Sequence, residues 1–359
     1  MGWYNASWKF RKKINVDYTK VGASLTDFQV YVNLADLGTN FFAHANADGS
    51  DIRITQSDGT TEQCIEVVSY SSAGTGALFF KGSSLSSTVN TAFYIYYGNS
   101  GASAYASNAT YGKYNTWYTG STSAVAVYHL EQDPSGSAPQ LLDSTTNQRN
   151  LTTAGTMTSG DLVTAKILKG IDFDGTDDVA SVAAADLSIN NIFTVQFWMY
   201  PAVIGHGAGV YASTGSTNAN RIYVMLYNNI TYVRRVNFNL YNSANNGYVF
   251  DKLSTAQWDA TTWAMFTGTY DGTNYAIYKN GTSSDTAAGT SGSTNTNRNI
   301  YLCQTNLLKY SGILDEFRLY NTTKTSTWIS TDYNNQNSPS TFYAIGPEEN
   351  RFIPRMMFI

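Results

Sequence analysis

The sequence predicts an all-β protein made of two antiparallel, jelly-roll-like β-sandwich domains in tandem. At 359 residues the chain is longer than one hydrophobic core usually supports, which is roughly 250 residues. Aromatic residues make up 14% of the chain, tyrosine leads with 27, and only 13% of residues are charged. Gly, Ser, Thr and Asn separate short apolar runs, as expected for many short strands joined by turns.

Short alternating runs predict the strands of the first half, at residues 28–34, 51–55, 64–70, 77–81 and 92–98. Asp58-Gly59 supplies the positive-φ positions of a tight hairpin turn. Residues 98–114 are small and polar, which indicates a connection. We therefore assign residues 1–115 to the first domain.

The second half repeats this pattern with clearer signals, at residues 124–130, 171–175, 193–201, 221–227, 234–240, 263–272, 274–281 and 313–321. Phe193, Val195, Phe197 and Met199 are expected to share one buried face. Asn280-Gly281 predicts a two-residue hairpin. Strands at this spacing indicate a sandwich or barrel, so residues 116–346 form the predicted second domain, with one short helical turn at 325–333.

Residues 347–359 are predicted to be a tail. Glu348 and Glu349 precede an apolar and basic segment, Arg351 to Ile359, whose hydrophobic side chains are dense enough to mark a contact. We expect the tail to pack against another subunit, in a homo-oligomer, or against a neighbouring virion or surface protein. A disordered end or a fold-back onto its own domain is the alternative.

Charge and apolar patterning exclude two classes of partner. The net charge of −4 provides no basic stripe for nucleic-acid phosphates. No stretch approaches the roughly 20 apolar residues of a membrane helix, and the N-terminal segment has no signal-peptide core, so no membrane partner is expected. Cys64 and Cys303 lie too far apart to indicate a disulfide framework or a metal site.

Both halves resemble known families. Residues 8–14, 27–34, 48–62 and 94–99 resemble a domain family of unknown function found ahead of lectin-like modules in bacterial and phage surface proteins. Residues 124–346 resemble the laminin-G-like, concanavalin-A-like sandwich through VAVYHLEQ, LLDSTTNQRN, FDGTDDVASV, FTVQFWMYP, TYDGTNYAIYKNGT and GILDEFRLYN. This fold hosts lectins, hydrolases and structural domains alike.

The second resemblance implies a structural Ca²⁺ site with oxygen ligands from Asp143, Asn147 and Asp315, together with Glu131. Calcium takes about six to eight oxygen ligands, so a few carboxylates suffice. In the alternative, Asp143 and Asn147 hydrogen-bond their own turn and Asp315 pairs with Arg318. A second acidic cluster, Asp174, Asp177 and Asp178, is either an ion or sugar site or a solvated turn.

The motifs argue against an enzyme. Concanavalin-A-like glycosidases carry two carboxylates at alternate positions of one strand, usually as E-x-D-x-E, and the sequence has no such motif. The nearest pair, Asp315-Glu316, is expected to point to opposite sides of its strand. His44, His129 and His206 lie in unrelated segments, which favours structural roles.

We therefore expect a non-catalytic surface-display or virion structural protein, of the phage fibre, decoration or receptor-binding type, that attaches to glycans or to neighbouring virion proteins. The alternative is a secreted bacterial adhesin or polysaccharide-binding module, with an extracellular or cell-surface location. Candidate residues for stacking on sugar rings are Tyr223, Tyr227, Tyr232 and Tyr241, and plain packing is their alternative role.

Overall fold

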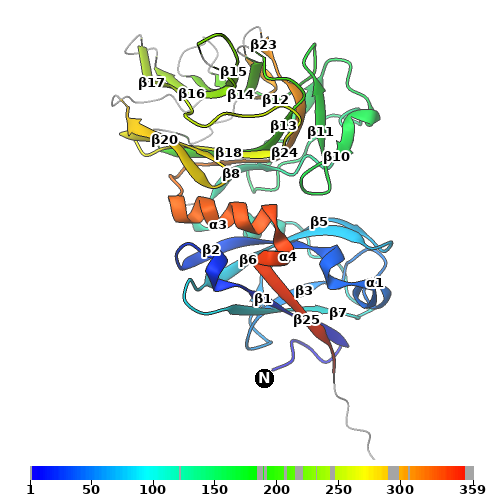
Figure 1. The fold of residues 1–359 in the computed structure, drawn as a ribbon. Helices are drawn as coiled ribbons and strands as arrows, with labels where there is room; N and C mark the ends of the chain where they lie inside the picture. Colours follow the sequence, from blue (N-terminus) through cyan, green and yellow to red (C-terminus); the bar gives the residue numbers. More distant parts are fainter. Residues whose placement is uncertain are drawn as a thin grey trace, which may run out of the picture. The chain divides into compact units, whose positions relative to one another are not determined.

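The computed structural model describes residues 2–120, 123–183, 189, 192–205, 208–214, 221–231, 233–242, 247–289, 299–305 and 308–351. The described chain is nearly all β, in antiparallel sheets, which confirms the predicted fold class (Figure 1). It divides into two compact units: unit 1 comprises Met1–Trp117 and Asn334–Ile359, and unit 2 comprises Tyr118–Tyr333. None of the helices in the described part of the chain is long and apolar enough to cross a membrane.

Unit 1 is built from two sheets. The five-stranded sheet has the order β25-β1-β7-β3-β4, with β25 Tyr343–Asn350, β1 Phe10–Val16, β7 Thr91–Tyr97, β3 Arg53–Gln56 and β4 Glu62–Gln63. The three-stranded sheet has the order β2-β6-β5, with β2 Leu25–Asn33, β6 Thr75–Leu85 and β5 Ile65–Ser71. Phe80 of β6 and Phe93 of β7 meet edge to face at 4.8 Å, which joins the two sheets in one core.

Short helical segments complete unit 1: η1 Tyr18–Lys20, η2 Leu34–Leu37, α1 Thr39–His44, α2 Lys113–Trp117 and α4 Pro339–Phe342.

The C-terminal strand β25 changes the predicted domain limits. It pairs antiparallel with β1, with Arg11 opposite Glu349, and the Arg11 guanidinium donates two hydrogen bonds to Glu349 Oε2 at 2.8 and 2.7 Å. Residues 334–351 therefore belong to unit 1, whereas the sequence placed 334–346 in the second domain and 347–359 in a tail. The pairing of the first strand with the last one produces no periodic pattern in the nearby sequence, so the sequence could not reveal it.

Unit 2 is a sandwich of two larger sheets. Sheet I has the order β10-β11-β24-β13-β18-β19-β20. An eighth strand, β8, also pairs with β24. Its strands are β8 Ala124–Tyr128, β10 Leu162–Thr164, β11 Lys169–Asp174, β13 Phe193–Pro201, β18 Ala264–Tyr270, β19 Asn274–Lys279, β20 Thr282–Ala288 and β24 Ser311–Tyr320. Sheet II has the order β17-β16-β15-β14-β21-β12-β9, with β22 and β23 attached.

The strands of sheet II are β9 Thr152–Ala154, β12 Val179–Val182, β14 Ala208–Thr214, β15 Arg221–Tyr227, β16 Arg235–Asn242, β17 Gly247–Leu253, β21 Asn299–Leu302, β22 Gln304–Thr305 and β23 Leu308–Lys309. The 3-10 helix η4 Ser159–Asp161 precedes β10.

The core of unit 2 is aromatic. Phe193, Val195, Phe197 and Met199 are all fully buried, as their alternation predicts. Phe238 of sheet II contacts Phe266 of sheet I at 5.9 Å, so the inner faces of the two sheets interlock. Asn280 and Gly281 have φ values of 52° and 75°, and they join β19 to β20 as the predicted two-residue hairpin.

Helix α3, Ser326–Asn337, is longer than the predicted helical turn, and the division between the units falls inside it. Within unit 2 its first half lies over the outer side of sheet I, where Trp328 meets Tyr320 of β24 edge to face at 5.6 Å. Asp332 accepts from the guanidinium of Arg318. This helix therefore covers the outer side of sheet I in unit 2.

Candidate functional site

The outer side of sheet II carries the candidate binding surface. On β15, Ile222, Val224 and Leu226 are fully buried in the core of unit 2, so the alternate residues Arg221, Tyr223, Met225 and Tyr227 point to the other side.

Cross-strand pairing extends this surface over β16 and β17. Arg221 lies opposite Tyr241 and Tyr241 opposite Tyr248, while Tyr223 lies opposite Asn239 and Asn239 opposite Asp251. We call the surface formed by the following residues the Tyr–Asn face: Arg221, Tyr223, Met225, Tyr227, Asn237, Asn239, Tyr241, Tyr248 and Asp251.

Stacking and hydrogen bonding order the Tyr–Asn face. The Arg221 guanidinium lies 5.1 Å from the Tyr223 ring and 4.7 Å from the Tyr241 ring. Tyr241 and Tyr248 meet edge to face at 5.3 Å.

Beside these rings runs a chain of amide hydrogen bonds. Asn239 Nδ2 donates to Asn237 Oδ1, and Asn237 Nδ2 donates to Asp251 Oδ1, both at 2.7 Å. The strands thus hold aromatic rings next to a fixed row of polar groups.

Exposure is graded across this surface. Tyr248 is 46% exposed, Tyr227 and Tyr241 are half-buried, and Tyr223 is 6% exposed. Burial raises the pKa of both Tyr223 and Tyr227, and Asp251 adds to the rise at Tyr227. The hydroxyls of Tyr223 and Tyr227 are therefore neutral at physiological pH, where each can donate and accept a hydrogen bond.

Three of the four predicted tyrosines, Tyr223, Tyr227 and Tyr241, lie together on this face, whereas Tyr232 falls outside the described residues. The sequence interpretation missed Arg221, Asn237, Asn239 and Asp251. Strict alternation through residues 221–227 and 234–240 was the signal that could have found the first three. Asp251 could not be found in that way, because β17 lacks a regular alternation of apolar residues.

Asp143, predicted as a calcium ligand, is buried, and hydrogen bonds occupy both of its carboxylate oxygens. Oδ1 accepts from the backbone N–H groups of Val127 and Thr145, and Oδ2 accepts from the N–H of Arg149 and the hydroxyl of Thr145. Asn147 Nδ2 donates to the carbonyl oxygen of Val125. These bonds fix the turn and tie it to β8.

Asp315 and Glu131, the other two predicted ligands, are electrostatic neighbours. Asp315 is fully buried, and its Oδ2 accepts from the N–H of Ile167 at 2.7 Å. Glu131 Oε1 accepts from the N–H of Lys169. Burial raises the pKa of both carboxyls, well above the ordinary value for Asp315 and to about 7 for Glu131, and Glu316 adds to the rise at each.

A β-bulge corrects the prediction for Asp315-Glu316. Trp198 pairs with Asp315 and Gln196 with Arg318, so one extra residue lies in β24, and Glu316 takes a positive φ of 51°. Leu314 and Phe317 point into the core. Both carboxylates therefore lie on the outer side of sheet I, not on opposite sides.

The alternative role expected for Asp315, an ion pair with Arg318, was also wrong, because Glu316 pairs with Arg318. Glu316 Oε2 accepts from the Arg318 guanidinium at 2.7 Å, and its Oε1 contacts His129 Nδ1 at 2.6 Å. Burial acts to raise the pKa of Glu316, but the charges of His129 and Arg318 hold it below its ordinary value.

The other histidines fall in separate places. The His44 ring stacks on Phe10 in unit 1 at 4.0 Å and contacts Glu348 Oε2, and His206 lies outside the described residues.

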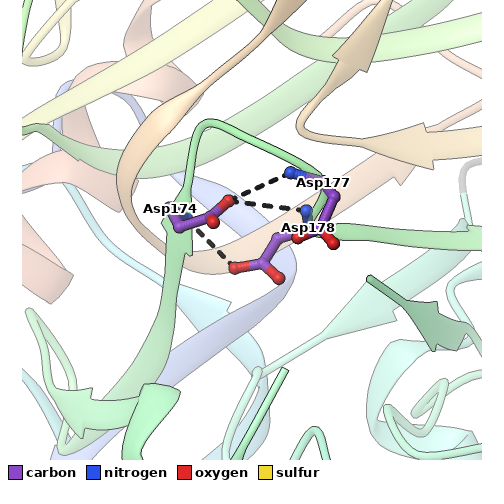
Figure 2. Close-up of side chains that lie close together, drawn as sticks. All are labelled: Asp174, Asp177 and Asp178. Atoms are coloured by element: carbon purple, nitrogen blue, oxygen red, sulfur yellow. Dashed lines mark hydrogen bonds between the residues drawn. The ribbon is translucent and has the colours of Figure 1, made fainter. Parts of the chain in front are cut away.

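Among the described residues, one group of three carboxylates lies close enough to share an ion: Asp174, Asp177 and Asp178, on the turn between β11 and β12 (Figure 2). One oxygen of each lies within 4.8 Å of the others. Asp174 Oδ1 accepts from the N–H groups of Thr176, Asp177 and Asp178. These hydrogen bonds close the turn at Asp174-Gly175.

Comparisons with known proteins agree with the fold of unit 2. The model of the concanavalin A-like lectin/glucanases superfamily matches residues 174–330. Comparison with curated protein sequences gave no match. The resemblance of residues 1–115 to a family of unknown function stays a prediction.

Several solved structures are similar to part of the chain. Domain 4 of AbnA, a GH43 extracellular arabinanase from Geobacillus stearothermophilus solved with arabinotriose, has 18% identity over 60% of this chain and 99% of its own, with a TM-score of 0.47. The binding domain of Paraclostridial Mosquitocidal Protein 1 has 15% identity over 59% of this chain and 52% of its own, with a TM-score of 0.45.

The binding domain of botulinum neurotoxin serotype G is similar at 14% identity, over 60% of this chain and 51% of its own, with a TM-score of 0.45. The similarity thus spans about half of each toxin binding domain. The family model matches residues 174–330, so this segment of unit 2 is similar to the concanavalin A-like lectin/glucanases superfamily.

Proposed function

We propose that the chain is a non-catalytic glycan-binding protein and that unit 2 binds sugars on the Tyr–Asn face. The observation that carries the proposal is the row of aromatic rings beside hydrogen-bonded Asn237, Asn239 and Asp251 on one side of a lectin-type sandwich. A sugar ring offers an apolar C–H face and a rim of hydroxyl groups, and this surface has a complement for each.

The aromatic rings and the charged groups of this face would contact different parts of a sugar. The half-buried rings of Tyr227 and Tyr241 and the exposed ring of Tyr248 provide area for stacking. The carboxylate of Asp251 accepts hydrogen bonds from sugar hydroxyls, and the Arg221 guanidinium donates them. Because strand pairing fixes both sets, little conformational entropy is lost on binding.

The non-catalytic part of the proposal rests on the chemistry of Asp315 and Glu316. Both are at most 1% exposed, and Glu316 is engaged by His129 and Arg318 through its two oxygens. A glycosidase needs two carboxyl groups that reach one glycosidic bond. Burial therefore leaves neither carboxylate open to a glycosidic bond of a substrate.

The test is a glycan array on the full chain, followed by titration calorimetry with the best glycan. Tyr248→Ala should raise Kd about three- to tenfold, since one ring-stacking contact contributes about 0.5–1.5 kcal/mol. Tyr248 is 46% exposed but packs edge to face on Tyr241, so the substitution should lower the melting temperature only slightly.

The matched control is Tyr18→Ala, which removes a 40% exposed tyrosine from unit 1 and should leave glycan affinity unchanged. No bound glycan at high protein concentration, or equal losses from both substitutions, would refute the proposed binding surface.

We also propose display on a particle, as a phage fibre, decoration or receptor-binding subunit. The resemblance of the first domain to a family of surface proteins supports this role, together with a sugar-binding second unit. A secreted bacterial adhesin is the competing proposal. Mass spectrometry of purified virions from the source decides between them: the chain should be found in the particle, and detection only in culture medium or on bacterial cells would favour the adhesin.

A further inference from the structure

The turn between β11 and β12 holds negative charge that its own hydrogen bonds do not balance. Asp174 and Asp177 are exposed, whereas Asp178 is only 2% exposed. Asp178 Oδ2 accepts from the backbone N–H of Asp174, as Figure 2 shows. The other oxygen, Oδ1, is buried and has no hydrogen-bond donor among the described residues.

A buried carboxylate oxygen without a donor is costly, because the charge loses its hydration and gains no hydrogen bond in return. It is therefore a feature that needs an explanation, and an unseen ion is one of the usual ones. The position of Asp178 favours this explanation, since its ligand oxygen lies within 4.8 Å of those of Asp174 and Asp177.

The surroundings add further negative charge. Burial raises the pKa of Asp178, and the neighbouring charges of Asp174, Asp161 and Asp177 raise it more. The pKa of Asp172 is also raised, first by burial and then by the charges of Asp161 and Asp174.

A lysine at this turn bonds to a backbone atom rather than to a carboxylate. Lys309 Nζ donates to the backbone carbonyl oxygen of Asp177 at 3.0 Å. No ion pair within 4.0 Å joins a lysine or arginine of the described chain to Asp174, Asp177 or Asp178. The negative charge of the turn therefore stays available to an ion.

We propose that Asp174, Asp177 and Asp178 bind a hard divalent cation, of the calcium type, at this turn. Calcium accepts irregular sets of carboxylate and water oxygens, whereas magnesium requires a near-octahedral set, so three carboxylates on one turn suit calcium. The ion would supply the positive partner that Asp178 Oδ1 lacks. This site is separate from the set Asp143, Asn147, Asp315 and Glu131, and it does not depend on glycan binding.

The test is calorimetric titration of Ca²⁺ into the full chain after EDTA treatment and dialysis. Binding should appear with Kd on the order of 10⁻⁴ to 10⁻³ M, the range of extracellular calcium modules with few charged ligands. Saturating Ca²⁺ should also raise the melting temperature, since the ion binds only the folded state. Mg²⁺ should bind more weakly.

Two variants locate the site. Asp178→Asn keeps an acceptor for the Asp174 N–H, and Asp177→Asn changes an exposed side chain with no cost to the core. Each should weaken Ca²⁺ binding about tenfold or more, as expected when one of a few charged ligands is lost.

Asp271→Asn is the matched control, because Asp271 occupies a second Asp-Gly turn of unit 2 and accepts from the N–H groups of Thr273 and Asn274. It should leave Ca²⁺ binding unchanged. Absence of Ca²⁺ binding, full binding by Asp177→Asn, or loss of binding only in Asp315→Asn would each overturn the proposed site.

Discussion

The raised pKa of Glu131 makes the stability of unit 2 depend on pH. Burial raises its pKa from an ordinary 4.5 to about 7, so the folded chain holds a proton there that the unfolded chain releases. Between those two pH values unfolding releases that proton, and the free energy of unfolding must fall as pH rises.

We predict that the stabilising contribution of protonated Glu131 is complete below about pH 4.5 and is lost as pH rises through about 7. Glu131→Gln carries no titrating proton, so its stability relative to the wild type should increase across this window. Thermal melts of both proteins from pH 4.5 to 7.5 measure the difference.

Asp133→Asn is the control for Glu131→Gln, because it removes an exposed carboxylate only two residues away. A constant difference between Glu131→Gln and the wild type at all pH values would contradict the raised pKa.

Sequence reasoning located some of these residues and misjudged others for a physical reason. Alternation in β15 and β16 was enough to group Tyr223, Tyr227 and Tyr241. It failed at Glu316, because a β-bulge inserts one residue and reverses the side of the strand on which every later residue lies. Nothing in GILDEFRLYN marks the bulge, since the residue that takes positive φ is a glutamate rather than a glycine or asparagine.

Strand β25 decides whether unit 1 is complete. It pairs with β1 along Tyr343–Asn350, and Glu349 pairs with the guanidinium of Arg11, which is itself 4.7 Å from the ring of Trp3 and 4.1 Å from that of Tyr94. Without β25, Arg11 loses its anion and the edge of β1 loses its partner strand.

We predict that a chain ending at Phe342 loses amide protection in β1 and β7 and keeps it in β13 of unit 2. Hydrogen exchange read by mass spectrometry measures both in one experiment. Glu349→Ala alone should cost about 1 kcal/mol, because Glu349 is partly exposed to solvent. Native protection in β1 of the shortened chain would show that β25 is dispensable.

A chain ending at Arg351 is the matched control. Arg351 donates from its backbone N–H to the carbonyl oxygen of Lys9 and from its side chain to that of Ala6, so this chain retains every described contact of β25. It also removes residues 352–359, the apolar part of the predicted tail, which lies outside the described residues. Light scattering on this chain should show a smaller assembly if the tail joins subunits, and an unchanged mass would reject that role.

Strands and turns that depend on nearby residues could be predicted from the sequence. A strand that depends on pairing with a distant segment could not. The runs at 193–201 and 221–227 coincide with β13 and β15, and Asn280-Gly281 forms its hairpin, because alternation and turn chemistry act over a few residues. Strand β25 contains Gly346 and Pro347 and depends on β1, so its sequence alone indicates only an extended end.

At the scale of the whole molecule, the chain consists of a discontinuous sandwich and a continuous one inserted in it. Unit 1 is made from both ends of the chain, whereas unit 2 uses one uninterrupted segment, Tyr118–Tyr333. Insertion of one domain into another is compatible with folding when the ends of the inserted segment lie at its surface. The sequence therefore predicted the number of domains correctly, but it predicted two consecutive domains where one domain is inserted in the other.

A crystal structure of the full chain with the best glycan of the array would test glycan binding by unit 2 on the Tyr–Asn face. We expect a sugar ring against Tyr227, Tyr241 or Tyr248, with hydroxyl groups bonded to Asp251 or Arg221. A sugar bound on any other surface, with this face left to solvent, would contradict it.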